Sequence, residues 1–301
     1  MTEPIVSVIL PAYNAGEYLI PAVRSVLSDG FDDLELRVYD DGSIDGSVDA
    51  LLAAVDDPRL VVVRHANRGL AATLNRGFEE ARGRYLARMD GDDQVVPGRF
   101  GTQAAFLDEH PDVVLVGGQI ERLVDGRTES ESRFPASHEE IVAGLVAGRH
   151  VVTHPSVMIR ADAITTVGGY WEHGVSEDWD LFLRLAEHGR LANVDRVVLR
   201  YRFHDSGINA SSMGKVRRNI RLAVENHRRR VAGEPELTPD AMWRAIGPVG
   251  RFGVTMQTRS LTLYRTALQA KASGHRARAA LALAGAAVCW PQQALHRLRS
   301  H

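Results

Sequence analysis

The sequence predicts an α/β fold, with a mainly parallel sheet flanked by helices, and an all-helical extension at its C-terminal end. Two observations predict it. Short apolar runs alternate with helical segments over residues 1–210, whereas only helices are expected from Ser211 onward. Residues 1–210 hold 20 Lys and Arg against 34 Asp and Glu, a net charge of −14, while residues 211–301 hold 16 against 4, a net charge of +12. We therefore expect an α/β domain over residues 1–210 and a basic helical extension over residues 211–301.

Four strands are expected in the first part of the α/β domain. The first run is apolar throughout and ends at Pro11, which is typical of a fully buried strand followed by a loop. The segments between the runs carry apolar residues at helical spacing. The expected strands are residues 5–10, 34–39, 60–63 and 86–89, and the expected helices are residues 17–27, 47–55 and 70–81.

Past Phe100 the pattern is less regular. A helix to about residue 110 leads to an apolar strand at 113–116, and residues 119–134 predict a hairpin that turns at Asp125-Gly126. The remaining expected elements are a helix at 141–147, a strand at 156–160, a short helix ending at Gly168-Gly169, a helix that opens at residues 176–180 and a strand at 197–202.

An acidic turn follows the fourth strand, where Asp90, Asp92 and Asp93 surround Gly91. Carboxylates this close repel one another unless a cation lies among them, and hard oxygen ligands suit Mg²⁺ or Mn²⁺. Glycine permits the sharp turn that such convergence needs. An ordinary surface turn is the alternative that the four residues alone leave open.

Polar side chains follow each of the first four strands. In an open parallel sheet, ligands bind beyond the carboxyl ends of the strands, so these side chains are expected at one edge. Their convergence, more than any single motif, predicts a binding site there. The residues are Tyr13, Asn14, Asp40, Asp41, Arg64, Asn67 and Asp90.

The single cysteine, Cys289, excludes an internal disulfide and favours a reducing compartment. The N-terminal residues lack the basic segment and apolar core of a signal peptide. No apolar run approaches the roughly 20 residues that a spanning helix requires. We therefore expect a cytoplasmic protein, soluble or peripheral to the inner face of the cell membrane.

Six short motifs follow one another over roughly residues 5–205. They are residues 6–14, Asp40-Asp41-Gly42-Ser43, Asn67-Arg68-Gly69 with Asn75, Met89-Asp90-Gly91-Asp92-Asp93, His154-Pro155-Ser156 and Glu177-Asp178-Trp179-Asp180-Leu181. Each motif is weak alone, but the ordered set is specific and resembles that of the family 2 glycosyltransferases. The resemblance implies the GT-A fold, a Rossmann-like mixed and mainly parallel sheet, and inverting transfer from a nucleotide-sugar donor.

The resemblance also implies roles for individual residues. Asp178 matches the base that deprotonates the acceptor hydroxyl, and Asp92 matches the metal ligand, with His204 as a further candidate ligand. Asp41 is the preferred partner of the base imide, and Asp90 lies nearer the ribose. Pro11, Tyr13, Asn14, Asp40, Asp41, Asn67, Arg68 and Asp90 are expected to bind the nucleotide, and Asp93, Glu177 and Trp179 to contact the donor sugar or the acceptor.

Structural interpretations of the same residues stay open. Asp40 and Asp41 suit a loop that caps the next helix, and Glu177 and Asp178 complement a helix N-terminus, where Asp180 is an alternative base. His154, before a proline, is more often structural and is left out of the catalytic set.

The implied activity is that of a metal-dependent, hexosyltransferase-type enzyme that moves one sugar to a hydroxyl on a glycan, a lipid-linked molecule or a cell-envelope precursor. The processive members of the family carry a Gln-x-x-Arg-Trp motif and membrane-spanning helices, which are missing here, so we expect a non-processive enzyme. A sugar-phosphate nucleotidyltransferase and a non-catalytic nucleotide-sugar-binding module are the alternatives. A dehydrogenase is disfavoured, because no Gly-x-Gly-x-x-Gly follows the first strand.

The C-terminal extension combines arginines with Leu, Ala and Val at helical spacing. Basic amphipathic helices suit an anionic membrane surface, where lipid-linked acceptors are found. A helical cap with solvated arginines is the other interpretation. Nucleic acid fits less well, because no recognisable nucleic-acid-binding module accompanies the charge.

Overall fold

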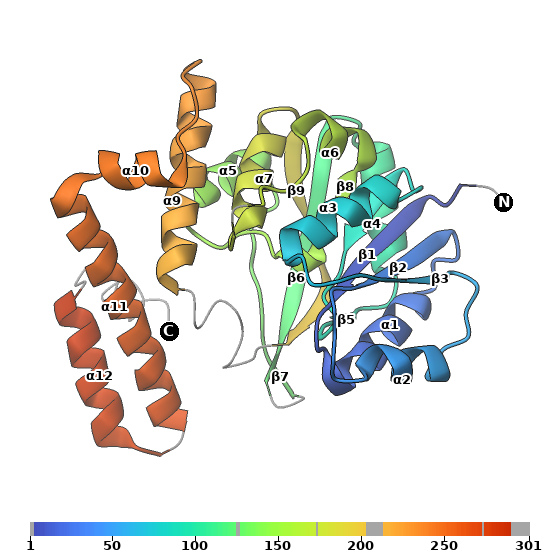
Figure 1. The fold of residues 1–301 in the computed structure, drawn as a ribbon, viewed down its shortest axis with the longest axis horizontal. Helices are drawn as coiled ribbons and strands as arrows, with labels where there is room; N and C mark the ends of the chain where they lie inside the picture. Colours follow the sequence, from blue (N-terminus) through green and yellow to red (C-terminus); the bar gives the residue numbers. More distant parts are fainter. Residues whose placement is uncertain (1–2, 125–126, 173, 203–212, 273, 290–301) are drawn as a thin grey trace. The chain divides into compact units, whose positions relative to one another are not determined.

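The computed structural model describes residues 3–124, 127–172, 174–202, 213–272 and 274–289 (Figure 1). The chain forms two compact units, Met1–Asp205 and Ser206–His301. The domain boundary expected at residue 210 falls in the segment 203–212, outside the described residues, and stays a prediction.

The first unit is built on a nine-stranded mixed sheet. Strands β1 to β4 are parallel, β8 runs antiparallel to β4 and β6, β9 is parallel to β6, and β5 is antiparallel to β9. The strand order is β3-β2-β1-β4-β8-β6-β9-β5, with β7 on β6. The strands are β1 (Val6–Ala12), β2 (Leu34–Asp40), β3 (Leu60–Arg64), β4 (Tyr85–Arg88), β5 (Gln94–Val95), β6 (Val113–Val124), β7 (Arg127–Glu131), β8 (Met158–Arg160) and β9 (Arg190–Arg202).

The loop expected to begin at Pro11 begins two residues later, because Pro11 and Ala12 extend β1 beside Tyr39 and Asp40. Proline lacks the N–H that a strand interior requires. The Ile9 carbonyl accepts a hydrogen bond from the Met89 N–H on the β4 side, so the backbone nitrogen of Pro11, two residues further on, faces the same side. The pairing of β1 with β4 ends at Ile9 and Arg88, so no β4 residue lies beside Pro11. The absence of an N–H at Pro11 therefore costs no hydrogen bond of the sheet.

Helices cover both faces of the sheet. Alternate residues of β1, from Val6 to Ala12, pack with α1 (Leu19–Leu27), α2 (Ser47–Ala54) and α4 (Arg99–Glu109) in the main core. Ile9 points to the other face, where it contacts Gly77 of α3 (Leu70–Glu80); a side chain at Gly77 would meet Ile9 at 2.4 Å. The later helices are α5 (His138–Val146), α6 (Ala161–Val167) and α7 (Glu177–Ala186).

Several sequence-based bounds needed correction. The helix expected from residue 17 opens with a short 3₁₀ helix, Gly16–Tyr18, and a second one, His154–Ser156, delays the strand expected at 156 until Met158. The strand expected at 197–202 begins at Arg190, since β9 pairs along most of β6. The antiparallel pairing of β6 with β7 confirms the hairpin, although its turn at Asp125-Gly126 lies outside the described residues.

All the regular secondary structure described in the second unit is helical. It contains α9 (Met213–Val231), α10 (Pro239–Ala245), α11 (Gly247–Ala272) and α12 (Arg276–Cys289). Ala279, Ala282 and Ala286 form one buried stripe of α12, and the Ser260 hydroxyl of α11 donates to the Ala286 carbonyl at 2.8 Å. Small side chains thus allow the two helices to pack closely. Among the described residues, none of the helices combines the length and apolar character needed to cross a bilayer.

Candidate active site

The carboxyl ends of the parallel strands bring the first set of predicted residues to one edge of the sheet. Ala12 of β1 is aligned with Asp40 of β2, and Asp40 with Arg64 of β3. The segments that follow these positions and β4 carry the polar residues selected from the sequence. Their common position therefore follows from strand register, as expected.

Asn14 ties the loop after β1 to the loop after β2. It has a positive φ of 50°, which asparagine tolerates better than most residues. Its backbone N–H donates to the Ser43 hydroxyl at 3.0 Å, and its side-chain oxygen accepts from the Ile44 N–H at 2.9 Å. Tyr13 beside it is 57% exposed, whereas Pro11 is buried in β1. The ring of Tyr13 is thus available to a ligand.

Asp41 holds the start of α3. Its two carboxylate oxygens accept backbone hydrogen bonds from Arg68 at 2.6 Å and from Gly69 at 3.0 Å. A carboxylate offers about four acceptor positions, so a nucleobase N–H can still be bound. Gly42 allows the loop after β2 to approach the backbone of Asn67 closely. It has a φ of +80°, and a Cβ there would lie 2.9 Å from the Asn67 nitrogen.

Asp40 is largely committed to the same loop. Its Oδ1 accepts from the Ser43 N–H at 2.8 Å, and its Oδ2 lies 3.8 Å from Arg64 Nε. The side chains of Asn67 and Arg68 are exposed beside these acids and stay free to meet an anionic ligand.

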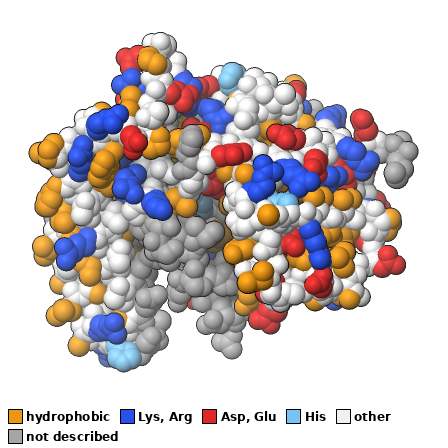
Figure 2. Space-filling model, in the orientation of Figure 1, with side chains coloured by type: hydrophobic (Ala, Val, Ile, Leu, Met, Phe, Trp, Pro, Cys, Tyr) orange, Lys and Arg blue, Asp and Glu red, His pale blue; other side chains and the backbone are white. Residues whose placement is uncertain are grey.

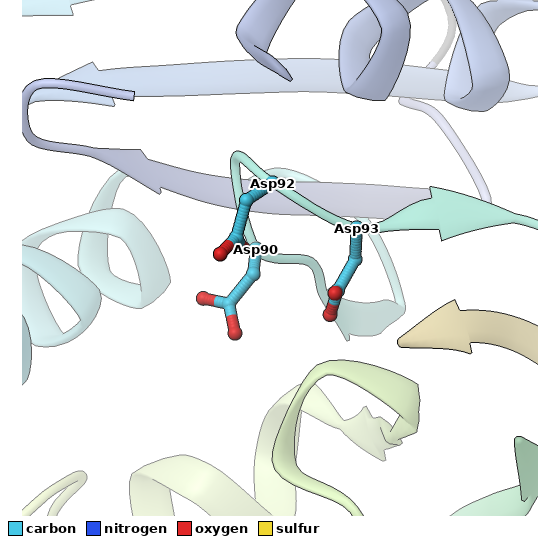
Figure 3. Close-up of side chains that lie close together, drawn as sticks. All are labelled: Asp90, Asp92 and Asp93. Atoms are coloured by element: carbon cyan, nitrogen blue, oxygen red, sulfur yellow. The ribbon is translucent and has the colours of Figure 1, made fainter. Parts of the chain in front are cut away.

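Asp90, Asp92 and Asp93 form an acidic cluster just after β4, with their side chains projecting to the same side of the turn (Figure 3). One carboxylate oxygen from each lies within 4.8 Å of the others. Asp93 is 1% exposed; its Oδ1 accepts from the Arg202 N–H at 2.7 Å, while its Oδ2 has no hydrogen-bond partner. Burial, together with the charges of Asp90 and Asp92, raises the pKa of Asp93 well above its usual range. These oxygen ligands fit Mg²⁺ or Mn²⁺, which would offset their repulsion.

Arg88 is a site residue that sequence reasoning missed. It ends β4, is 2% exposed, and its Nη1 lies 2.5 Å from Asp90 Oδ2. Burial alone would lower the pKa of Arg88, but the Asp90 carboxylate outweighs it and raises the pKa. The available signal was an arginine inside an otherwise apolar strand, where a charge is rarely buried without a partner.

A second pair of acids opens α7. Ser176, the residue before the helix, has a φ of +68°. Glu177 is 7% exposed, and burial, followed by the charge of Asp178, raises its pKa to about 7. Asp178 keeps part of its surface exposed, but the surrounding protein removes most of the water from its carboxyl group and thereby raises its pKa. Asp90 contributes to both pKa shifts, so the two acidic groups share one electrostatic environment.

The next two residues of α7 are directed elsewhere. The indole N–H of Trp179 donates to the Leu145 carbonyl of α5 at 3.0 Å, and the side chain is 7% exposed. This position serves helix packing, and the sugar contact expected for Trp179 stays a prediction. Asp180 is paired with Arg184 at 2.7 Å. His204, a predicted metal ligand, lies outside the described residues.

Comparison with known proteins agrees with this architecture. The family model described as "Glycosyl transferase family 2" matches residues 7–168. The chain therefore belongs to glycosyl transferase family 2, the family that its sequence motifs resemble.

Two relatives are putative or assigned glycosyltransferases. The putative glycosyltransferase EpsE of Bacillus subtilis is 34% identical over 192 residues, which cover 62% of this chain and 68% of the relative. The amylovoran biosynthesis glycosyltransferase AmsE of Erwinia amylovora is 29% identical over 208 residues, or 67% of this chain and 78% of the relative. The uncharacterized protein y4gI of Sinorhizobium fredii is 28% identical over 242 residues, 77% of this chain, but the match spans only 26% of that longer protein.

Two solved structures share the fold. Residues 1–349 of S. aureus TarS, in complex with UDP-GlcNAc, have a TM-score of 0.60 at 16% identity, covering 94% of this chain and 91% of the other. The mannosyltransferase PcManGT of Pyrobaculum calidifontis, in complex with GDP-Man and Mn²⁺, has a TM-score of 0.58 at 18% identity, covering 99% and 79%. The mixed sheet with flanking helices is thus a GT-A fold, as expected.

Proposed function

We propose that this glycosyltransferase moves one sugar from a nucleoside-diphosphate sugar to a hydroxyl acceptor with inversion, and that Asp178 is its base. The observation that carries the proposal is the common environment of two acidic groups from distant parts of the sequence. Asp90 and its neighbours suit the donor diphosphate with a cation, and Asp178 suits the acceptor.

The residues at the strand ends suit the donor. Asp41 keeps acceptor positions for the base, Tyr13 exposes its ring, and Arg68 offers an exposed cation. Asp92, with Asp90 and Asp93, would hold Mg²⁺ or Mn²⁺, which neutralises charge on a leaving diphosphate. His204 is retained as a further proposed ligand. PcManGT, which shares the fold, was solved with GDP-Man and Mn²⁺.

Asp178 suits the acceptor because a raised carboxyl pKa makes a stronger base near neutral pH. The acceptor oxygen bonds to the anomeric carbon as the bond from that carbon to the diphosphate oxygen breaks. The hydroxyl proton passes to the Asp178 carboxylate. A single displacement of this kind inverts the anomeric configuration. We propose that Glu177, beside the base, contacts the sugar or the acceptor.

The acceptor class is proposed from relatives. AmsE is named for amylovoran biosynthesis, and another relative, GgaB of Bacillus subtilis, is named a minor teichoic acid biosynthesis protein. We propose a glycan or lipid-linked precursor of the cell envelope. Membership of glycosyl transferase family 2 disfavours the nucleotidyltransferase alternative.

The second unit supports a peripheral membrane contact. Leu281 and Val288, two turns apart on α12, are 81% and 83% exposed. Basic and apolar side chains are interspersed over the visible surface of this unit (Figure 2). We propose that it contacts the anionic inner face of the cell membrane. Sedimentation with anionic vesicles should be lost in Leu281→Asp and at high salt; equal binding to neutral vesicles would contradict the charge component.

Thermal shift tests the donor and metal assignment. We expect a nucleoside diphosphate to raise the melting temperature only with Mn²⁺ or Mg²⁺ present, because a ligand that prefers the folded state stabilises it. Asp92→Ala should remove this effect, whereas Asp56→Ala, an exposed acid in a loop, should not. Stabilisation that is indifferent to a chelator would overturn the metal assignment.

A further inference from the structure

Tyr170 is fixed from three directions although it lies in a loop. The side chain of Asn75 in α3 accepts from the Tyr170 N–H at 2.6 Å and donates to the Tyr170 carbonyl at 2.9 Å. The Tyr170 ring stacks on Phe78 with a centroid distance of 5.3 Å. Gly169 has a φ of +74°, and a Cβ there would lie 2.6 Å from the Asn75 oxygen. The backbone and the ring of Tyr170 are therefore held against α3.

The Tyr170 hydroxyl lies 2.6 Å from His154 Nε2, and both side chains are buried, at 3% and 8% exposure. Burial, followed by the charge of Arg88, lowers the pKa of His154 well below its usual range, so the ring is neutral. A neutral imidazole has one N–H. When the tyrosine hydroxyl donates to Nε2, that N–H is on Nδ1, which lies 3.8 Å from Glu177 Oε1. The distance is too long for a direct hydrogen bond, so the N–H dipole acts on the carboxylate electrostatically.

Apart from this dipole, the Glu177 carboxylate is stabilised by its own backbone N–H and by the charge of Arg88, both of which act to lower its pKa. Ser176 makes no side-chain cap to the first turn of α7, and Asp178 repels the Glu177 carboxylate when both are ionised. An oriented dipole beside Glu177 opposes this repulsion. Because Glu177 and Asp178 are consecutive in the same turn, a shift of one moves the other.

We propose that Asn75, Tyr170 and His154 are positioning residues, which set Glu177 and through it the base Asp178 relative to the acceptor. This inference rests on the proposed function. In the described part of the chain, none of the three is hydrogen-bonded to the residues that suit the donor. We therefore expect variants at these positions to change turnover and to leave donor binding unchanged. A displacement of about 1 Å at a reacting group costs up to about a hundredfold in rate.

Tyr170→Phe is the test, because it removes one hydroxyl and keeps the ring on Phe78. We expect kcat for sugar transfer to fall by about tenfold or more, with the donor KM and the affinity for nucleoside diphosphate and Mn²⁺ within about twofold of wild type. The matched control is Tyr85→Phe, which removes a hydroxyl bonded to Asp108 from another buried tyrosine. That variant should keep its kcat.

A double-mutant cycle with Glu177→Gln separates positioning from a general structural effect. If Tyr170 acts through Glu177, Tyr170→Phe should reduce kcat far less in the Glu177→Gln background than in wild type, whereas independent effects multiply.

A pair of His154 variants tests the same inference if Tyr170→Phe does not fold. His154→Asn, which keeps an amide donor near the Nδ1 position, should retain more activity than His154→Gln. Wild-type kcat in Tyr170→Phe, multiplicative effects, or equal losses in the two His154 variants would overturn the inference. Full turnover in Asp178→Asn would instead overturn the proposed function.

Discussion

Arg184 and Asp180 form an ion pair across one turn of α7, with Asp180 Oδ2 2.8 Å from Arg184 Nε and 2.7 Å from Nη2. The same guanidinium donates to the carbonyls of Val167 and Gly169. Asp180 therefore supports the loop that leads to Tyr170. This commitment favours Asp178 over Asp180, the alternative base that the sequence left open.

Asp180→Asn should lower stability more than activity. Both partners of the ion pair are largely buried, and breaking such a pair costs on the order of 3 kcal/mol. Chemical denaturation should show this loss, while sugar transfer at a temperature where the variant is folded should stay within about threefold of wild type. Complete loss of transfer in a folded variant would return Asp180 to the candidates for the base.

Glu177→Gln should stabilise the protein at neutral and higher pH. The folded-state pKa of Glu177, about 7, lies above the ordinary value of 4.5 for a glutamate, so the fold disfavours the ionised form. Wild-type stability contributed by this group therefore falls as pH rises from 4.5 to about 7, and the variant escapes the loss. The gain should be near zero in acid and on the order of 2–3 kcal/mol above neutral pH. Urea titrations across that range measure it, with the exposed Glu79→Gln as the control; a gain that is constant with pH would contradict the assignment.

Gly42→Ala should weaken nucleotide binding. The positive φ of Gly42 costs a side chain about 1–2 kcal/mol, and the Cβ would also press on the Asn67 nitrogen at 2.9 Å. Gly30→Ala is a matched control, since Gly30 has a φ of +93° and nothing within 4 Å of its Cβ position. Both variants should lose stability, but only Gly42→Ala should raise the Kd for a nucleoside diphosphate, as measured by calorimetry. Equal Kd values for Gly42→Ala and Gly30→Ala would show that the loop at Gly42 does not contribute to nucleotide binding.

Asp93→Asn should have opposite effects with and without metal. In a chelator, the variant should be more stable than wild type, because burial and the charges of Asp90 and Asp92 disfavour ionised Asp93, and asparagine does not carry this penalty. The added stabilisation by Mn²⁺ should shrink, because one oxygen ligand loses its charge. Melting temperatures measured with a chelator and with Mn²⁺ test both signs. An unchanged response to Mn²⁺ would exclude Asp93 from the metal site.

Features that depend on residues close together in the sequence were predictable. The parallel strand ends and the acidic cluster follow from short apolar runs and the residues that end them, and the order of the motifs gave the family. Contacts between distant segments were not predictable. Asn75 and Tyr170 are 95 residues apart. His154 was interpreted as structural because it precedes a proline, and the sequence does not show its contact with Tyr170. The extension of β1 through Pro11 likewise depends on where β4 ends.

The most direct test of the account is Asp178→Asn, measured for donor binding and sugar transfer on the same preparation, with Asp180→Asn as the comparison. Asp178→Asn should bind nucleoside diphosphate and Mn²⁺ within about threefold of wild type, yet lose at least about a thousandfold in kcat, because only the acceptor proton has lost its base. Transfer at the wild-type rate by Asp178→Asn would contradict the central claim that Asp178 is the base of an inverting glycosyltransferase.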